Sequence, residues 1–158
     1  MATLKSDYAK GVKPMPVAQG AEVVSVRMEI SLAAPLAAGD ILYMGDLPED
    51  HVPVDCEVDT DDLDTGATPT IALQAGVLNA DATDLDIAGS GGGSWIGSST
   101  VGQAGGLARA SDKFVKRVAP SATAKKKVGI KVSTGPATGA TSGKVGLTLH
   151  YRAAHYAQ

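Results

Sequence analysis

Cysteine and aromatic residues are scarce in this chain of 158 residues. The single cysteine, Cys56, cannot form an internal disulfide, and its place among alternating apolar residues favours a small buried hydrophobe over a reactive thiol. Redox chemistry is therefore not expected of this residue. With one Trp, one Phe and four Tyr, the core has to be built from Val, Leu, Ile and Ala.

Long hydrophobic runs are also missing. No stretch approaches the roughly 18 apolar residues of a membrane-spanning helix, and residues 1–20 contain no apolar segment of the kind that a signal peptide requires. We therefore expect neither a membrane span nor export by a signal peptide. One domain of this length buries about 68–70 % of the surface of its unfolded chain, which is enough for a core.

Catalytic and nucleotide-binding motifs are absent. Serine-hydrolase chemistry would need Gly-x-Ser-x-Gly on a strained turn, but Gly97 lies one residue too far from Ser94. The glycine run at residues 89–93 does not complete Gly-x-Gly-x-x-Gly, because Ser94 stands at the last position, and no P-loop lysine follows. We expect no enzyme activity and no cofactor.

The acidic stretch Asp59–Asp64 is the best candidate for a metal site. An EF-hand loop that begins at Asp59 needs an oxygen ligand at its fifth position, Gly at its sixth and Glu at its twelfth. The sequence has Leu63, Asp64 and Thr70 there. We predict solvated carboxylates with Leu63 turned inward, and keep a looser calcium site as the alternative.

The remaining candidates for chemistry also have plainer interpretations. His51, His150 and His155 are too scattered for a metal-ligand set and are predicted to lie on the surface. Lys125–Lys127 is predicted to be a solvated strand entry, since the chain is net acidic and lacks the interleaved aromatics of nucleic-acid sites. Trp95 is either a core residue or an interface anchor.

Charge is distributed unevenly along the chain. Residues 40–86 contain 13 acidic residues and no Lys or Arg, whereas 10 basic residues and a single acid, Asp112, follow Gly91. If the two halves meet in one sandwich, these charges attract within the subunit. If they lie on opposite sides, neighbouring copies can dock head to tail.

Period-two alternation of apolar residues predicts a β protein. The 19 glycines and 8 prolines would interrupt helices, and apolar residues alternate with polar ones in segments 22–32, 52–58, 71–77, 128–132 and 145–151. The apolar run 40–44 suits a strand covered on both faces. We further expect a strand at 114–118, one helical turn within 95–106 and a flexible loop at 89–93. The result is a single all-β domain, a β-sandwich or jelly-roll-like fold.

Residues 1–19 lack periodicity and carry Lys5, Lys10 and Lys13. We interpret them as an extended N-terminal arm, followed by the sandwich domain at 20–158. The arm is either a frayed terminus or a segment that orders on a partner surface.

Several phrases of the sequence, taken in their order, resemble a known family. They are the strand EVVSVRMEISL at 22–32, VDCEVDTDDLDTGATPTIALQAGV at 54–77, WIGSSTVGQAGG at 95–106 and KKKVGIKVSTGPATGATSGKVGLTLHYR at 125–152. This layout is similar to that of small virion proteins of tailed bacteriophages, which decorate or cement the assembled head beside the major capsid protein.

The resemblance implies a structural, non-enzymatic role on the capsid exterior of the virion. The partners would be the major capsid protein and further copies of the chain, as a dimer or trimer, with no nucleic acid and no membrane. Shell contacts do not follow from the resemblance, and we predict Lys5, Lys10, Lys13 and Trp95 for them. The alternatives are a head-completion or tail-tube protein, or a carbohydrate-binding module, for which exposed aromatics are few.

Overall fold

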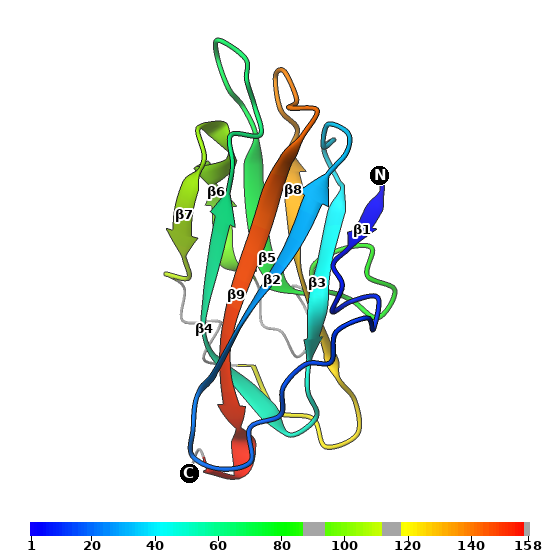
Figure 1. The fold of residues 1–158 in the computed structure, drawn as a ribbon, viewed down its shortest axis with the longest axis vertical. Coiled ribbons are helices and arrows are strands. Elements are labelled where there is room, and N and C mark those ends of the chain that lie inside the picture. Colours follow the sequence, from blue (N-terminus) through cyan, green and yellow to red (C-terminus); the bar gives the residue numbers. More distant parts are fainter. Residues whose placement is uncertain (87–93, 112–117, 157–158) are drawn as a thin grey trace.

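Two β-sheets packed face to face form the body of the protein (Figure 1). The computed structural model describes residues 1–86, 94–111 and 118–156. Sheet A contains, in spatial order, β1 (Thr3–Lys5), β3 (Ile41–Leu47), β8 (Lys126–Thr134), β5 (Ala72–Val77) and β6 (Ser94–Ser99). Sheet B contains β2 (Val24–Leu32), β9 (Gly143–Ala153), β4 (His51–Thr60) and β7 (Gly106–Arg109). The predicted β-sandwich is confirmed.

The order of the strands is that of a jelly roll. Strands β2, β9, β4 and β7 form one sheet and β3, β8, β5 and β6 the other, so two Greek keys interlock. β1 extends sheet A by pairing in parallel with β3, whereas the other paired strands are antiparallel. The chain changes sheet at most connections, which ties the two layers together.

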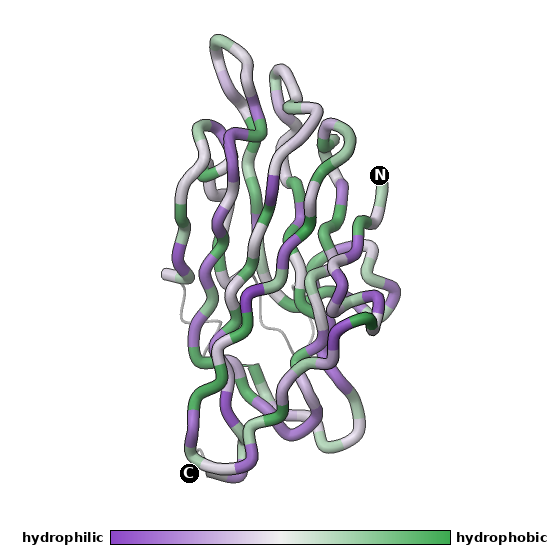
Figure 2. The backbone as a smooth tube through the Cα atoms, in the orientation of Figure 1, coloured by the Kyte–Doolittle hydropathy of each residue, from purple (hydrophilic) through white to green (hydrophobic). Residues whose placement is uncertain are grey.

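The alternation in the sequence determines which side chains fill the space between the sheets. Along β2, Val26, Met28 and Ile30 are buried, and the residues between them are exposed or half-buried. Figure 2 shows the same alternation of hydrophilic and hydrophobic residues along the strands. The five alternating segments become β2, β4, β5, β8 and β9, with ends within two residues of those predicted. Cys56 is fully buried in β4 and burial raises the pKa of its thiol, as expected of a core residue.

Strand β3 is covered on both faces, as its continuous apolar run predicts. Leu42 and Met44 belong to the main core between the sheets. Ile41 and Tyr43 belong to a second cluster with Leu78, Ala82 and Leu85, which lie in the connection after β5. Lys131 of β8 holds this connection through an ion pair with Asp84, with 2.6 Å between Nζ and Oδ1. The 78–86 connection thus covers the outer side of sheet A.

The 95–106 segment differs in part from the sequence-based interpretation. It contains the predicted helical turn as the 3-10 helix η1 (Val101–Gln103), but also strand β6 and the start of β7, which we did not predict. The β5–β6 pairing carries register shifts and Ser98 has a positive φ of 23°, so β6 lacks the regular alternation that reveals a strand. The expected 89–93 loop, and the expected 114–118 strand except Val118, lie outside the described residues.

Candidate interaction surface

The N-terminal segment (residues 1–19) is packed on the sandwich, which differs from the extended arm that we predicted. β1 adds to sheet A, and Ser6 is buried beside it. The Ser6 amide donates to the Tyr43 carbonyl at 3.0 Å, and its hydroxyl donates to the Met44 carbonyl. These partners lie 37 and 38 residues away along the chain, so local sequence carries no sign of them.

Residues 6–13, the 6–13 turn, form a compact hydrogen-bonded unit. The Ser6 hydroxyl oxygen accepts hydrogen bonds from the amides of Tyr8 and Ala9, both at 3.2 Å. The Asp7 carbonyl accepts from the amides of Val12 and Lys13 at 2.9 and 3.2 Å. Gly11 supplies the left-handed conformation that closes the turn, with φ of 73°. The turn is therefore structured within the subunit.

The 6–13 turn and the residues that follow it are attached to strands of both sheets. Tyr8 and Met15 approach Gly45 of β3, where an added Cβ would lie 3.3 Å from Tyr8 Cβ and 3.5 Å from Met15 Sδ. The Tyr151 hydroxyl donates a hydrogen bond to the Pro16 carbonyl. Burial raises the pKa of Tyr151 to about 12, so the hydroxyl keeps the proton that it donates. The segment thus runs from the β1 edge of sheet A to β9 of sheet B.

His51 completes this attachment, and our prediction of a surface histidine at this position is wrong. His51 is 4 % exposed, and Ala18 lies against its ring. Nε2 accepts a hydrogen bond from the Ala18 amide at 3.0 Å, while Nδ1 donates to the Glu49 carbonyl at 2.6 Å. The ring also meets that of Tyr151 edge-on, with 5.7 Å between centroids. His155, in contrast, is exposed and lies 3.8 Å from the Asp50 carboxylate.

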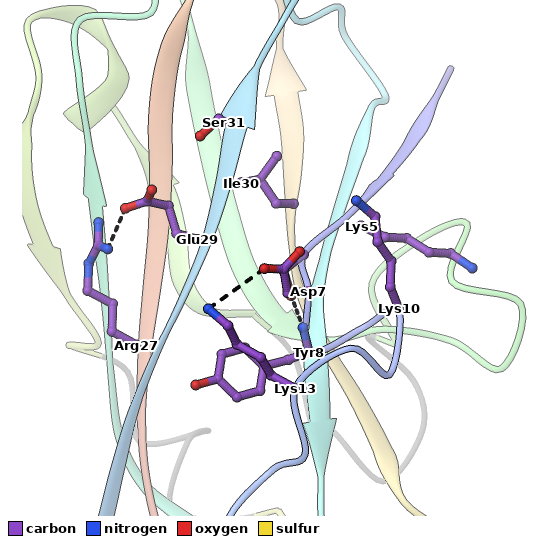
Figure 3. Close-up of a pocket in the computed structure, with 10 residues that line it drawn as sticks. Lys5, Asp7, Tyr8, Lys10, Lys13, Arg27, Glu29, Ile30 and Ser31 are labelled. Atoms are coloured by element: carbon purple, nitrogen blue, oxygen red, sulfur yellow. Dashed lines mark hydrogen bonds and ion pairs between the residues drawn. The ribbon is translucent and has the colours of Figure 1, made fainter.

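Lys5, Lys10 and Lys13 are exposed and line one hollow of about 460 Å³ (Figure 3). Its charged lining residues are these three lysines and Arg27 against two carboxylates, those of Asp7 and Glu29. Lys13 reaches Asp7 at 3.7 Å, and Arg27 pairs with Glu29 at 2.6 Å. The structure therefore brings the three predicted contact lysines together on one surface with a net positive charge.

A second hollow, of about 440 Å³, lies on the other side of the 6–13 turn. Tyr8, Lys10 and Lys13 line both hollows, and Lys125 joins them in the second. The turn is thus a ridge between two concave regions. Lys5 and Lys127 both lie over the Tyr43 ring, at 5.9 and 5.8 Å from its centroid, which extends the cationic surface along sheet A.

Trp95, the fourth predicted contact, is a core residue. Its side chain is 0 % exposed and belongs to the main hydrophobic cluster between the sheets. The sequence left a core residue and an interface anchor as equal alternatives, and the structure supports the first. Its assignment as a shell contact is therefore wrong for the folded subunit.

The acidic loop is only partly solvated, which corrects our prediction for Asp64. Leu63 is buried as expected, but Asp64 is also buried, with 1 % exposure. Its carboxylate accepts hydrogen bonds from the amides of Thr70 and Ala137, at 2.6 and 2.8 Å, and of Thr138 at 2.8 Å. Burial alone would raise its pKa, but these donors hold the pKa well below its usual value. Asp64 thus fastens the 61–70 loop to the loop between β8 and β9.

The other acidic residues of this stretch also have partners within the chain. Asp59 pairs with Arg27 across β9, and Asp61 accepts a hydrogen bond from the Lys144 amide at 2.8 Å. Asp62 accepts from the Asp64 amide at 3.1 Å. Within the described ranges, no group of three or more His, Cys, Asp or Glu side chains is placed to hold a metal ion.

Ion pairs connect the acidic and basic halves of the sequence within one subunit. Arg109 of β7 binds Asp55 of β4, with 2.7 Å between Nε and Oδ2, and Lys131 binds Asp84. This arrangement agrees with the first of our two alternatives for the charge distribution. Such exposed pairs contribute little to stability, because solvent and salt screen them. No helix of the described residues is long and apolar enough to cross a membrane.

Comparison with known proteins identifies the family. No protein-family model and no curated protein matches the sequence. A chain in the structure of the capsid of Ralstonia phage GP4 matches with 40 % sequence identity and a TM-score of 0.83, over 95 % of this chain and 97 % of that chain. A chain in the capsid asymmetric unit of cyanophage Pam1 matches with 26 % identity and a TM-score of 0.64, over 88 % and 90 % of the two chains. The protein therefore belongs to a family of structural proteins of bacteriophage capsids.

Proposed function

We propose that this protein is a capsid decoration protein, which binds the outer surface of an assembled phage shell and stabilises it by bridging neighbouring shell subunits. The observation that supports this most directly is the 40 % identity, over nearly the full length of both chains, to a chain of the Ralstonia phage GP4 capsid. The jelly-roll body and the cationic surface beside it are compatible with this role.

The proposed role follows from mass action. A protein that binds the assembled lattice but not its separated subunits lowers the free energy of the assembled state, by an amount that grows with its concentration relative to its Kd. One copy that contacts two subunits adds avidity, because dissociation of either subunit requires both contacts to break. The role requires complementary surfaces and many copies. We therefore propose no enzymatic activity and no cofactor.

The partners in this proposal are the major capsid protein and further copies of the chain itself, as a dimer or trimer. Neither nucleic acid nor a membrane takes part. Lys5, Lys10 and Lys13 remain our predicted contacts with the shell, and the structure supports this proposal by placing all three on one exposed surface.

The test uses phage heads assembled without this protein. Purified protein is added to expanded heads and to unassembled shell subunits, and binding is measured by co-sedimentation. We expect saturable binding to heads and none to separated subunits, together with a higher temperature of DNA release from the decorated heads. Electron microscopy of labelled copies should place them across the outer shell. Copies confined to the portal axis would instead indicate a head-completion or tail-tube protein and refute the proposal.

A further inference from the structure

The exposed apolar side chains of this protein are concentrated at its N-terminal end. Five large hydrophobic residues of the described ranges are exposed, and four of them fall within the first 23 residues. They are Met1, Val12, Val17 and Val23, and the fifth is Leu107 of β7. Single exposed hydrophobes are common on protein surfaces, but Val12 belongs to the 6–13 turn and Val17 lines the second hollow beside it. We call the turn with its lysines, Lys10 and Lys13, the cationic ridge, and these two valines make it a candidate interaction surface.

Val12 is the most prominent of these residues within a structured element. It is 69 % exposed and belongs to the 6–13 turn, between Lys10 and Lys13. The hydrogen bonds that the Ser6 hydroxyl and the Asp7 carbonyl accept from amides of the turn hold its backbone in one conformation. A residue presented in this way loses little conformational entropy when a partner binds it, so more of the contact energy contributes to affinity.

The charges around Val12 indicate the chemistry of the partner. The two hollows beside the turn are lined by Lys5, Lys10, Lys13, Arg27 and Lys125 against three carboxylates, those of Asp7, Glu29 and Asp46. The chain as a whole has a formal net charge of −3. An acidic partner surface would therefore attract this region and repel much of the remainder, which fixes the orientation of docking.

We propose that the 6–13 turn is the element by which this protein docks on the capsid shell, with Val12 inserted into an apolar pocket of the shell surface that is rimmed by carboxylates. This inference rests on the proposed function, since the shell is the partner. It adds an apolar anchor to the contact and limits the docking element to a ridge that is already folded in the free subunit. The lysines set the orientation of docking and the rate of association, and burial of the valine supplies affinity for the shell.

The experiment measures binding of variants to heads assembled without this protein. Val12→Asp places a charge where the apolar pocket is expected, and Lys10→Glu reverses one charge of the ridge. Leu107→Asp is the matched control for the first variant, because Leu107 is 64 % exposed on β7, at the opposite edge of sheet B from β2. Arg109→Glu is the control for the second, because the Arg109 side chain is 66 % exposed on the same distant strand β7. Thermal unfolding of each variant establishes that it is folded.

We expect Val12→Asp to weaken binding to heads by about tenfold or more. Lys10→Glu should weaken it several-fold and reduce its dependence on salt, whereas the two controls should bind within about twofold of the wild type. Binding of Val12→Asp at wild-type strength, or an equal loss for Leu107→Asp, overturns the inference while the proposed function stands. Failure of the wild-type protein to bind heads overturns both. Loss of self-association by Val12→Asp, seen by light scattering without loss of head binding, assigns the turn to a second copy and also overturns the inference.

Discussion

Replacement of Gly129 by alanine tests the packing of sheet A most directly. Gly129 lies in the middle of β8, paired with Tyr43 on one side and Gly76 on the other. An added Cβ would lie 2.6 Å from the Leu42 carbonyl oxygen and 2.7 Å from Leu78 Cδ1. The Leu78 side chain can rotate, but the Leu42 oxygen belongs to β3, which is itself covered on both faces.

The magnitude follows from these contacts. Overpacking of a core costs about 1–3 kcal/mol, and we expect about 3 kcal/mol for Gly129→Ala because a backbone atom has to move. For a domain of this size that loss corresponds to a decrease in Tm of roughly 6–12 °C. Gly97→Ala in β6 is the matched control, since its Cβ would meet only Ser94 Oγ, at 3.8 Å. The free energy of unfolding of this control should be unchanged or higher by up to about 1 kcal/mol, because alanine has less backbone freedom than glycine in the unfolded chain.

Urea unfolding followed by fluorescence provides the measurement. Trp95 is the single tryptophan and is fully buried, so its emission reports on the core of the sandwich. The midpoint should fall for Gly129→Ala and remain or rise for Gly97→Ala, with equal slopes for both. Two protein concentrations separate folding from self-association. A Gly129→Ala midpoint equal to that of the wild type would show that β3 and β8 can separate without cost, which contradicts the packing argument.

Three further predictions concern side chains whose position in the fold the sequence patterns did not determine. Asp64→Asn should lower the unfolding temperature clearly more than the exposed control Asp81→Asn, because an amide replaces one acceptor oxygen of the buried carboxylate with a donor. Because the pKa of Asp64 is lowered in the fold, the ionised carboxylate stabilises the protein above the ordinary pKa of 3.8, and this stabilisation is lost as the pH falls below that value. The unfolding temperature of Asp64→Asn should therefore depend less on acid pH than that of the wild type. An unchanged dependence would contradict this. Tyr151→Phe should cost about 0.5–1.5 kcal/mol and speed hydrogen exchange in the segment around Pro16 while β8 and β9 stay protected, and uniform protection would refute the attachment. Trp95→Ala should cost about 3–5 kcal/mol, and a loss below 1 kcal/mol by calorimetry would argue against its burial.

Only some residues of the cationic ridge could be predicted from the sequence. Lys5, Lys10 and Lys13 could be proposed as contacts, because they cluster in a short polar segment. Val12 was not proposed, since an isolated valine without periodicity carries no signal for exposure. Trp95 was proposed on its residue type alone, and that argument applies equally to a core and to an interface.

The amino-acid sequence by itself determined the fold class, because the period of a strand is local: alternate residues point to opposite faces, so segments such as 22–32 and 145–151 identify themselves. The buried state of Cys56 follows from the same alternation. Only the tertiary structure decided the state of the N-terminal segment, of His51 and of Asp64. Their hydrogen-bond partners are 38 residues away for Ser6, 33 for His51 and 74 for the Asp64–Thr138 contact. These contacts depend on which loops the jelly roll brings together, and a pattern within a short window cannot contain that information.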